Sequence, residues 1–120
     1  MIENFEEYTE EIAAHHMPVV QWLDDYFAGR TKYTVPTSAK GVKGPVIVKV
    51  IQHLFSLKFN ETNLRTAINH LRQKGSVPIG SSSKGYYTCQ TQDEIESNIR
   101  SLKQRANGIL YAAKGLERFI

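Results

Sequence analysis

The stretch Leu64–Tyr87, LRTAINHLRQKGSVPIGSSSKGYY, decides the fold. Its first half predicts a helix over 61–74, because apolar side chains recur at the i, i+3, i+4, i+7 spacing of one helix face. Asn60 is a favourable N-cap for this helix, and Gly75 is the expected left-handed stop. The apolar positions are Leu64, Ala67, Ile68 and Leu71.

The second half of this stretch predicts a β-hairpin. Two short runs with β-forming residues, at 77–80 and 85–90, surround a Ser81–Lys84 tip. Tyr86 and Tyr87 are neighbours on the return strand and must face opposite sides of it. We expect one of them to pack on the core and the other to face the hairpin tip or a nucleic acid.

Upstream of this unit, residues 45–56 predict another helix. Pro45 suits the first helical position, and Ile47, Val50, Ile51 and Leu54 fit one helix face. A buried strand is the alternative, because the segment is rich in β-branched residues. Residues 30–45, with two prolines and two glycines, predict a loop with short extended structure at 33–35.

The N-terminal region predicts aromatic-rich helical structure. Asn4 is a suitable N-cap with Glu7 three residues on, and Gly29 ends the segment. Pro18 removes a backbone donor, so we expect either a kink near His16 or two helices, 5–16 and 18–28.

The C-terminal region predicts one long helix over 92–118, opened by a Thr91–Glu94 capping box. Its apolar residues alternate spacings of four and three, which is the heptad pattern of a coiled coil. These residues, ending with Ile120, are Ile95, Ile99, Leu102, Ala106, Ile109, Ala113 and Leu116. Two interpretations of this helix remain. It pairs with the same helix of a second copy of the chain, which we favour, or it folds back across the N-terminal aromatic helix of its own chain.

Charge is distributed unevenly along the 120 residues. Residues 1–28 carry −7, residues 29–90 carry +9 and residues 91–120 carry +1, which gives the net +3. The basic middle section coincides with the predicted helix and hairpin. A basic face on such a unit is the electrostatic footprint of a nucleic-acid contact.

Several other classes of protein are disfavoured by composition. The single cysteine, Cys89, allows no internal disulfide and no cysteine-based zinc site. No apolar run reaches the roughly 18 residues of a membrane span, and the acidic N-terminus does not resemble a targeting peptide. His15 and His16 point about 100° apart on a helix, so we expect no metal site. No nucleophile–base pair or carboxylate pair stands out, so we expect no enzyme, no catalytic residue and no cofactor.

The polar face of the 61–74 helix carries side chains that can read base edges. Arginine suits guanine, asparagine and glutamine suit adenine, and threonine can hydrogen-bond or contact a thymine methyl group. The expected base-reading residues are Thr62, Arg65, Thr66, Asn69 and Gln73. The expected phosphate contacts are Lys40, Lys43, Arg72, Lys74, Ser82, Ser83 and Lys84.

The helix and hairpin together resemble the winged helix-turn-helix superfamily, particularly the DNA-binding domain of the biotin operon repressor and similar bacterial and phage domains. Residues 44–90 carry the resemblance, through a helical L-R-x-x-G pattern followed by a strand and a K-G-Y wing. The matching residues are Leu64, Ile68, Leu71, Arg72, Gly75, Pro78, Ile79, Lys84, Gly85 and Tyr86. One extra residue precedes the strand, and the Leu57–Asn60 turn lacks the usual glycine. Biotin-ligase activity does not carry over, because the chain has no such region.

This resemblance implies that 45–56 and 61–74 form the helix-turn-helix and that the hairpin is the wing. It also implies that Tyr86 is the structural one of the two tyrosines. The expected fold is α+β, mostly helical, with an extra N-terminal helix or kinked pair and the long heptad helix. The expected organisation is an acidic helical segment 1–29, a basic loop 30–44, the winged unit 45–90 and the C-terminal helix 91–120.

The expected function is sequence-specific binding of double-stranded DNA by a cytoplasmic transcriptional regulator of a bacterium or a phage-infected host, as a homodimer without membrane attachment. Two alternatives remain open. One is an accessory DNA-binding protein of phage replication or packaging. The other is a protein-interaction adaptor whose winged unit does not bind DNA.

Overall fold

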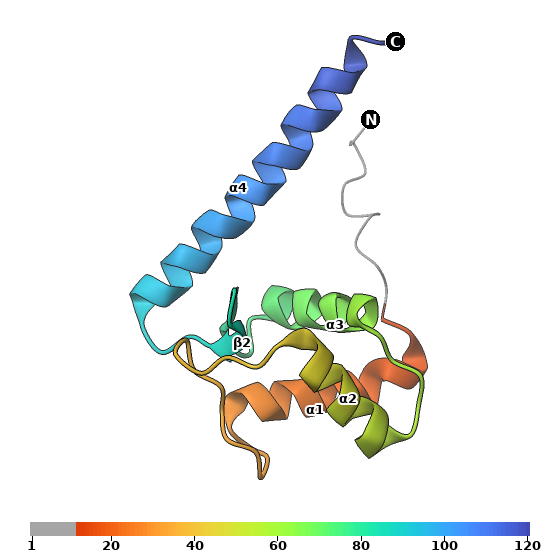
Figure 1. Ribbon diagram of the computed structural model, residues 1–120, viewed down its shortest axis with the longest axis vertical. Coiled ribbons are helices and arrows are strands. Elements are labelled where there is room, and N and C mark those ends of the chain that lie inside the picture. Colours follow the sequence, from red (N-terminus) through yellow and green to blue (C-terminus); the bar gives the residue numbers. More distant parts are fainter. Residues whose placement is uncertain (1–11) are drawn as a thin grey trace. The chain divides into compact units, whose positions relative to one another are not determined.

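The computed structural model describes residues 12–120, and the chain is α+β and mostly helical in this range (Figure 1). The chain divides into two compact units, with the boundary between Thr88 and Cys89. In order, the elements are a 3-10 turn Ala14–His16, α1 Met17–Ala28, α2 Gly44–Phe55, α3 Glu61–Lys74, β1 Ile79–Ser82, β2 Gly85–Thr88 and α4 Gln92–Glu117.

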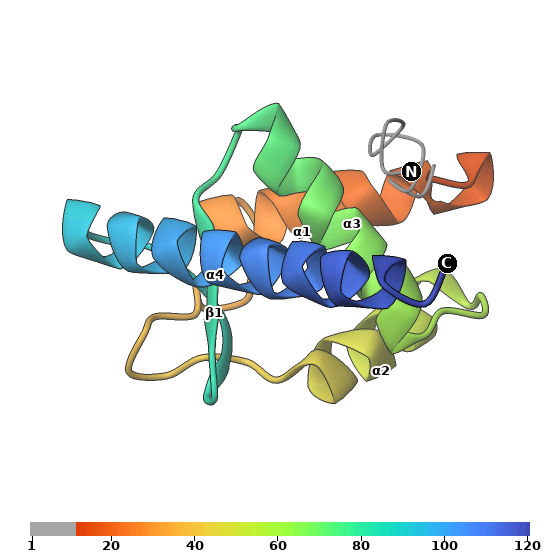
Figure 2. The same cartoon turned by 90° about the horizontal axis from the view of Figure 1, so that it is seen from above.

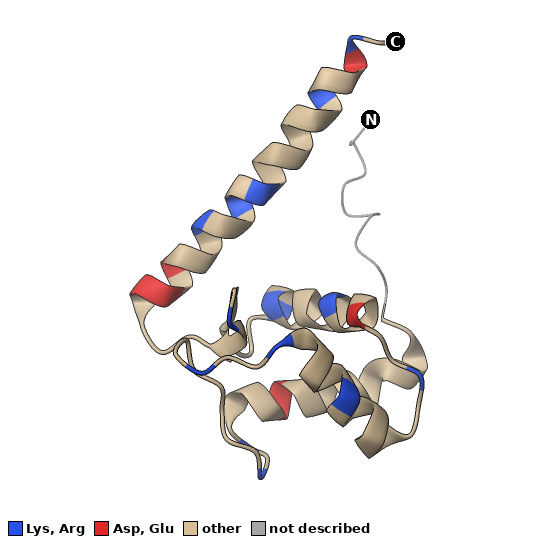
Figure 3. Ribbon diagram, viewed as in Figure 1, with Lys and Arg blue, Asp and Glu red and all other residues tan. Residues whose placement is uncertain are grey.

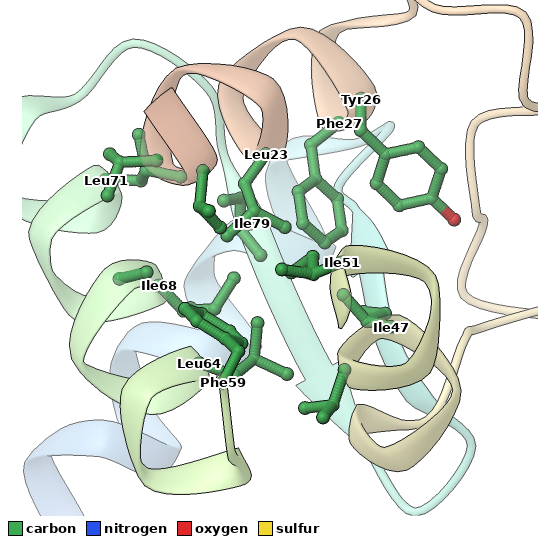
Figure 4. Close-up of a cluster of buried hydrophobic side chains, with 14 of the residues drawn as sticks. Leu23, Tyr26, Phe27, Ile47, Ile51, Phe59, Leu64, Ile68, Leu71 and Ile79 are labelled. Atoms are coloured by element: carbon green, nitrogen blue, oxygen red, sulfur yellow. The ribbon is translucent and has the colours of Figure 1, made fainter. Parts of the chain in front are cut away.

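The core of the first unit lies between three helices and the hairpin. Helix α3 packs against both α1 and α2, while β1 contacts α3 and β2 contacts α1. The close-up shows aliphatic and aromatic side chains from α1, α2, α3 and β1 pointing toward one another (Figure 4). The side chains with no more than 2% exposure include Leu23, Phe27, Ile47, Ile51, Leu64 and Ile68. Helix α1 therefore belongs to the same core as α3 and is not a separate N-terminal segment.

Pro18 sets the start of α1 as its second residue, where a missing backbone N–H costs no helical hydrogen bond. The short 3-10 turn at 14–16 precedes it, so the chain has the expected break near His16. Gly29 ends α1 with φ of 83°. The predicted Asn4 cap and most of the helix predicted at 5–16 lie outside the described residues.

Helix α2 occupies almost the predicted range, but it buries a different face. Ile47, Val48 and Ile51 are buried, whereas Leu54 is 41% exposed and Val50 is only partly covered. The predicted apolar face was therefore right for Ile47 and Ile51 and wrong for Val50 and Leu54. The loop before α2 forms no strand at 33–35. It contacts β2 at two other points: Val42 pairs with Tyr86, and the Thr88 N–H donates to the Pro36 carbonyl at 3.0 Å.

Helix α3 begins and ends at the predicted residues. The Asn60 side chain accepts from the Asn63 backbone N–H at 2.8 Å, and the Asn63 side chain accepts from the Asn60 N–H at 3.0 Å. This reciprocal pair satisfies two of the N–H groups left unpaired at a helix start. Gly75 closes the helix with φ of 71°.

The hairpin is shifted from its predicted position. Ile79 pairs with Thr88 and Ser82 with Gly85, so the tip is the two-residue turn Ser83–Lys84. Val77 and Pro78 lead into β1 and are not part of it. Of the two tyrosines, Tyr87 is the more buried, at 6% exposure, while Tyr86 is partly buried and packs against the hydrophobic core, as expected of a structural tyrosine.

The second unit consists of α4, the three residues before it and the three residues after it. Thr91 Oγ1 accepts from the Glu94 N–H at 3.2 Å, while the Glu94 carboxylate accepts from the Gln90 N–H at 2.7 Å. The return bond therefore goes to the residue before the N-cap, not to Thr91 itself. Within residues 12–120, no helix is both long enough and apolar enough to cross a membrane.

Candidate nucleic-acid interface

The outward face of α3 carries the side chains predicted to read bases. Thr62, Arg65, Asn69 and Gln73 are exposed, and Thr66 is partly exposed. They lie on α3 opposite the buried Leu64, Ala67, Ile68 and Leu71, because a 3.6-residue period separates the two faces. Four of the five predicted base-reading residues thus share an exposed surface of one helix.

Short hydrogen bonds order the first turns of this face. Arg65 Nη2 donates to Thr62 Oγ1 at 3.2 Å, and Thr66 Oγ1 donates to the Thr62 carbonyl at 3.1 Å. The first bond fixes part of the long Arg65 side chain and leaves the other guanidinium N–H groups pointing elsewhere. A partly ordered arginine loses less side-chain entropy when it binds.

Arg72 has a different position from the other predicted phosphate contacts. Its Nε donates to the Ile79 carbonyl at 2.9 Å and its Nη2 to Ser81 Oγ at 3.2 Å, and both bonds are partly buried. The guanidinium therefore joins the last turn of α3 to β1. We assign Arg72 to holding the hairpin against the helix.

A groove of about 320 Å³ lies between the start of α2, the start of α3 and the hairpin. It brings together Lys43, Arg65, Ser82 and Ser83 from three parts of the chain. Its full lining is Lys43, Gly44, Glu61, Leu64, Arg65, Ser81, Ser82, Ser83, Gly85 and Tyr86. Figure 3 shows basic residues on α3, on the hairpin and on the segment that enters α2.

Two glycines let the hairpin approach the segment before α2. Val42 and Tyr86 exchange backbone hydrogen bonds of 2.9 and 2.8 Å. A Cβ on Gly85 would lie 2.5 Å from the Val42 carbonyl, and one on Gly41 would lie 2.8 Å from the Lys84 carbonyl oxygen. Because no side chain fits there, the backbones touch and Lys43 is held beside the hairpin. Figure 2 shows the hairpin projecting from the three helices with this segment next to it.

The tip of the hairpin presents polar groups to solvent. Ser82 Oγ accepts from the Lys84 N–H at 3.1 Å, which stabilises the turn. Ser82, Ser83 and Lys84 are all exposed. The base of the hairpin is anchored instead, because Thr88 Oγ1 donates to the Phe27 carbonyl at 2.7 Å.

Four of the seven predicted phosphate contacts do not line the groove: Arg72, Lys84 at the hairpin tip, Lys40 and Lys74. Lys40 is exposed in the loop before α2, where its backbone pairs with Thr37, and Lys74 is exposed in the last turn of α3.

The two aspartates of α1 form ion pairs close to their own helix, since Arg30 contacts Asp25 at 2.9 Å and Asp24 at 3.3 Å.

Sequence reasoning missed two residues of the groove. Tyr86 lines it while also packing against the core, and no local pattern distinguishes it from Tyr87. Glu61 also lines it, although the sequence assigned it only to the start of the helix dipole. A carboxylate here favours a cationic or hydrogen-bonding partner on its own side of the groove and disfavours a phosphate next to it.

Comparison of the chain with protein-family models, with curated proteins and with solved structures found no match. Within residues 12–120, no group of three or more His, Cys, Asp or Glu side chains is arranged to hold a metal ion.

Proposed function

We propose that the first unit is a winged helix-turn-helix that binds double-stranded DNA, with α3 as the recognition helix and the β1–β2 hairpin as the wing. The observation that carries this proposal is the groove, in which Lys43, Arg65 and the hairpin serines converge from three separate segments. A role in transcriptional regulation, in a bacterium or a phage-infected cell, is the context we favour.

Base recognition would come from the exposed side of α3. An α-helix fits the major groove, and residues in its first turns reach the base edges. Arg65 and Asn69 lie one turn apart on this side and are both exposed. Arg65 would contact guanine O6 and N7, and Asn69 would contact adenine N6 and N7. Each such bidentate contact contributes about 1–3 kcal/mol of discrimination.

Phosphate contacts would flank α3 on its hairpin side. Lys43 immediately precedes α2, whose N-terminus adds the partial positive charge of the helix dipole. Lys84 and the two exposed serines extend the same polar surface to the hairpin tip. Glu61 would remain toward the bases, where cytosine amino groups are acceptable partners for a carboxylate.

The proposal is tested with the double variant Arg65→Ala and Asn69→Ala, which removes base-reading groups from a solvent-exposed surface. We expect at least tenfold weaker binding to a DNA site selected with the native chain, with an unchanged circular dichroism spectrum. Lys32→Ala is the matched control for loss of a cation, because Lys32 lies over the Tyr33 ring at 5.6 Å and not in the groove. Equal affinity of the double variant and the native chain would overturn the proposal.

A further inference from the structure

Helix α4 has an apolar face that nothing within its own unit covers. None of its residues is buried. Ile99 is 44% exposed, Ile109 is 62% exposed and Leu116 is 67% exposed. A continuous apolar face of this length on a helix marks an interaction surface.

The periodicity of this face indicates what covers it. Its apolar residues keep the 3.5-residue repeat from Ile95 to Leu116 without interruption. A strict heptad selects another helix with the same repeat, since both must supercoil together to keep their seams in contact. A second copy of α4 meets this requirement.

The sizes of the side chains indicate the direction of the partner helix. All d-type positions carry Ile or Leu, whereas two of the a-type positions carry Ala106 and Ala113. In a parallel pair in register, a faces a, so each alanine would meet an alanine and leave two underfilled layers. In an antiparallel pair, a faces d, so each alanine meets an isoleucine or a leucine in every register.

Charge favours the same direction. The first turns of α4 carry three acids, Asp93, Glu94 and Glu96, and no base. Residues 100–118 carry five bases and one acid. A parallel pair would place the two acidic ends together, whereas an antiparallel pair places each acidic end beside the last turns of its partner, which carry Lys114 and Arg118 and one acid, Glu117. We propose that α4 forms an antiparallel homodimer with α4 of a second copy.

This arrangement has a geometric consequence. Each first unit joins α4 at its N-terminal end, so an antiparallel pair carries the two units at opposite ends. The 26 residues of α4 span about 39 Å, which sets the scale of the separation between the two attachment points. If the proposed DNA binding holds, the two half-sites lie at least about one helical turn, roughly 34–36 Å, apart.

The orientation is tested by cross-linking, which does not depend on DNA. Glu96→Cys and Glu117→Cys full-length chains, both with Cys89→Ser, are mixed and treated with a short-arm bismaleimide. In an antiparallel pair, positions 96 and 117 of opposite chains lie side by side. In a parallel pair, these positions lie about 32 Å apart along the axis. We expect the mixed 96–117 product to predominate and the native chain to sediment as a dimer at micromolar concentration.

A matched pair of variants tests the surface itself. Leu102→Glu places a charge in the heptad face and should abolish both the dimer and the cross-link. Gln104→Glu adds the same charge on the outward side and should leave both unchanged. A predominance of 96–96 and 117–117 products would overturn the antiparallel orientation. A native chain that sediments as a monomer would overturn the dimer, whatever the outcome of DNA binding.

Discussion

Arg72 in α3 and Ile79 in β1 are joined by a hydrogen bond of 2.9 Å from the guanidinium Nε to the backbone carbonyl. A second bond, from Nη2 to Ser81 Oγ at 3.2 Å, extends the contact along β1. These bonds connect the helix to the hairpin across seven and nine residues of sequence. The position of the hairpin beside α3 therefore depends on a side chain that sequence alone assigned to phosphate binding.

Replacing Arg72 with alanine should destabilise the first unit. The Ile79 carbonyl would lose a charged donor in a partly buried position, which costs about 1–3 kcal/mol. Urea unfolding followed by circular dichroism measures this change. Arg65→Ala is the matched control, because Arg65 is exposed and, within residues 12–120, its side chain bonds only Thr62. The free energy of unfolding of this variant should change by less than about 0.5 kcal/mol. Equal stability of the two variants would contradict the role given to Arg72.

Replacing Asn60 with alanine should shorten or weaken α3. The substitution removes the acceptor for the Asn63 N–H and should lower the free energy of unfolding by about 1 kcal/mol. Asn107→Ala, within exposed α4, removes the same amide from a position that caps nothing. If Asn107→Ala lowers the free energy of unfolding as much as Asn60→Ala does, the Asn60 cap does not stabilise α3.

Gly85→Ala should disrupt the contact between the hairpin and the segment before α2. The residue has φ of 110°, and an added Cβ would lie 2.5 Å from Val42. Gly75→Ala separates the backbone strain from the steric clash. Gly75 also has positive φ, at 71°, but no atom lies within 4 Å of a Cβ added there. We expect Gly75→Ala to cost about 1 kcal/mol from backbone strain alone and Gly85→Ala to cost clearly more. Thermal unfolding that ranks them in the opposite order would refute this explanation.

Tyr26 should make the stability of the fold sensitive to alkaline pH. Burial raises the pKa of Tyr26 above its ordinary value. The folded chain therefore keeps the phenol neutral while the unfolded chain ionises it near pH 10. The contribution of the neutral Tyr26 phenol to the free energy of unfolding is intact below about pH 10. It is lost as the pH rises through the pKa of Tyr26 in the folded chain. Urea unfolding across this range should show a shallower decline for Tyr26→Phe, whereas Tyr111→Phe, at a side chain 72% exposed, should decline as the native chain does.

Local signals in the sequence were sufficient for the helices. Asn60 and Gly75 bound α3 at the predicted residues, since a cap and a left-handed stop act within one turn. Pro18 likewise located the break before α1. These features depend on neighbouring residues only, so a single sequence carries them.

Features that depend on distant contacts were not predictable in this way. The hairpin pairs with a segment distant in sequence, since Tyr86 and Val42, 44 residues earlier, exchange backbone hydrogen bonds. Lys43 follows Val42 directly, so this contact places Lys43 beside the hairpin, where it lines the groove. Likewise, the polarity of Arg72 suggested a surface role, and only the proximity of β1 gives it a structural one.

The most direct test of the proposed function is the binding of random-sequence duplex DNA, measured by fluorescence anisotropy across a salt series. If about five phosphates are neutralised, the logarithm of affinity should fall with the logarithm of salt concentration at a slope near −4.5. We predict micromolar binding at low salt with a slope of about this size. Absence of binding even at low salt would contradict DNA binding by this chain.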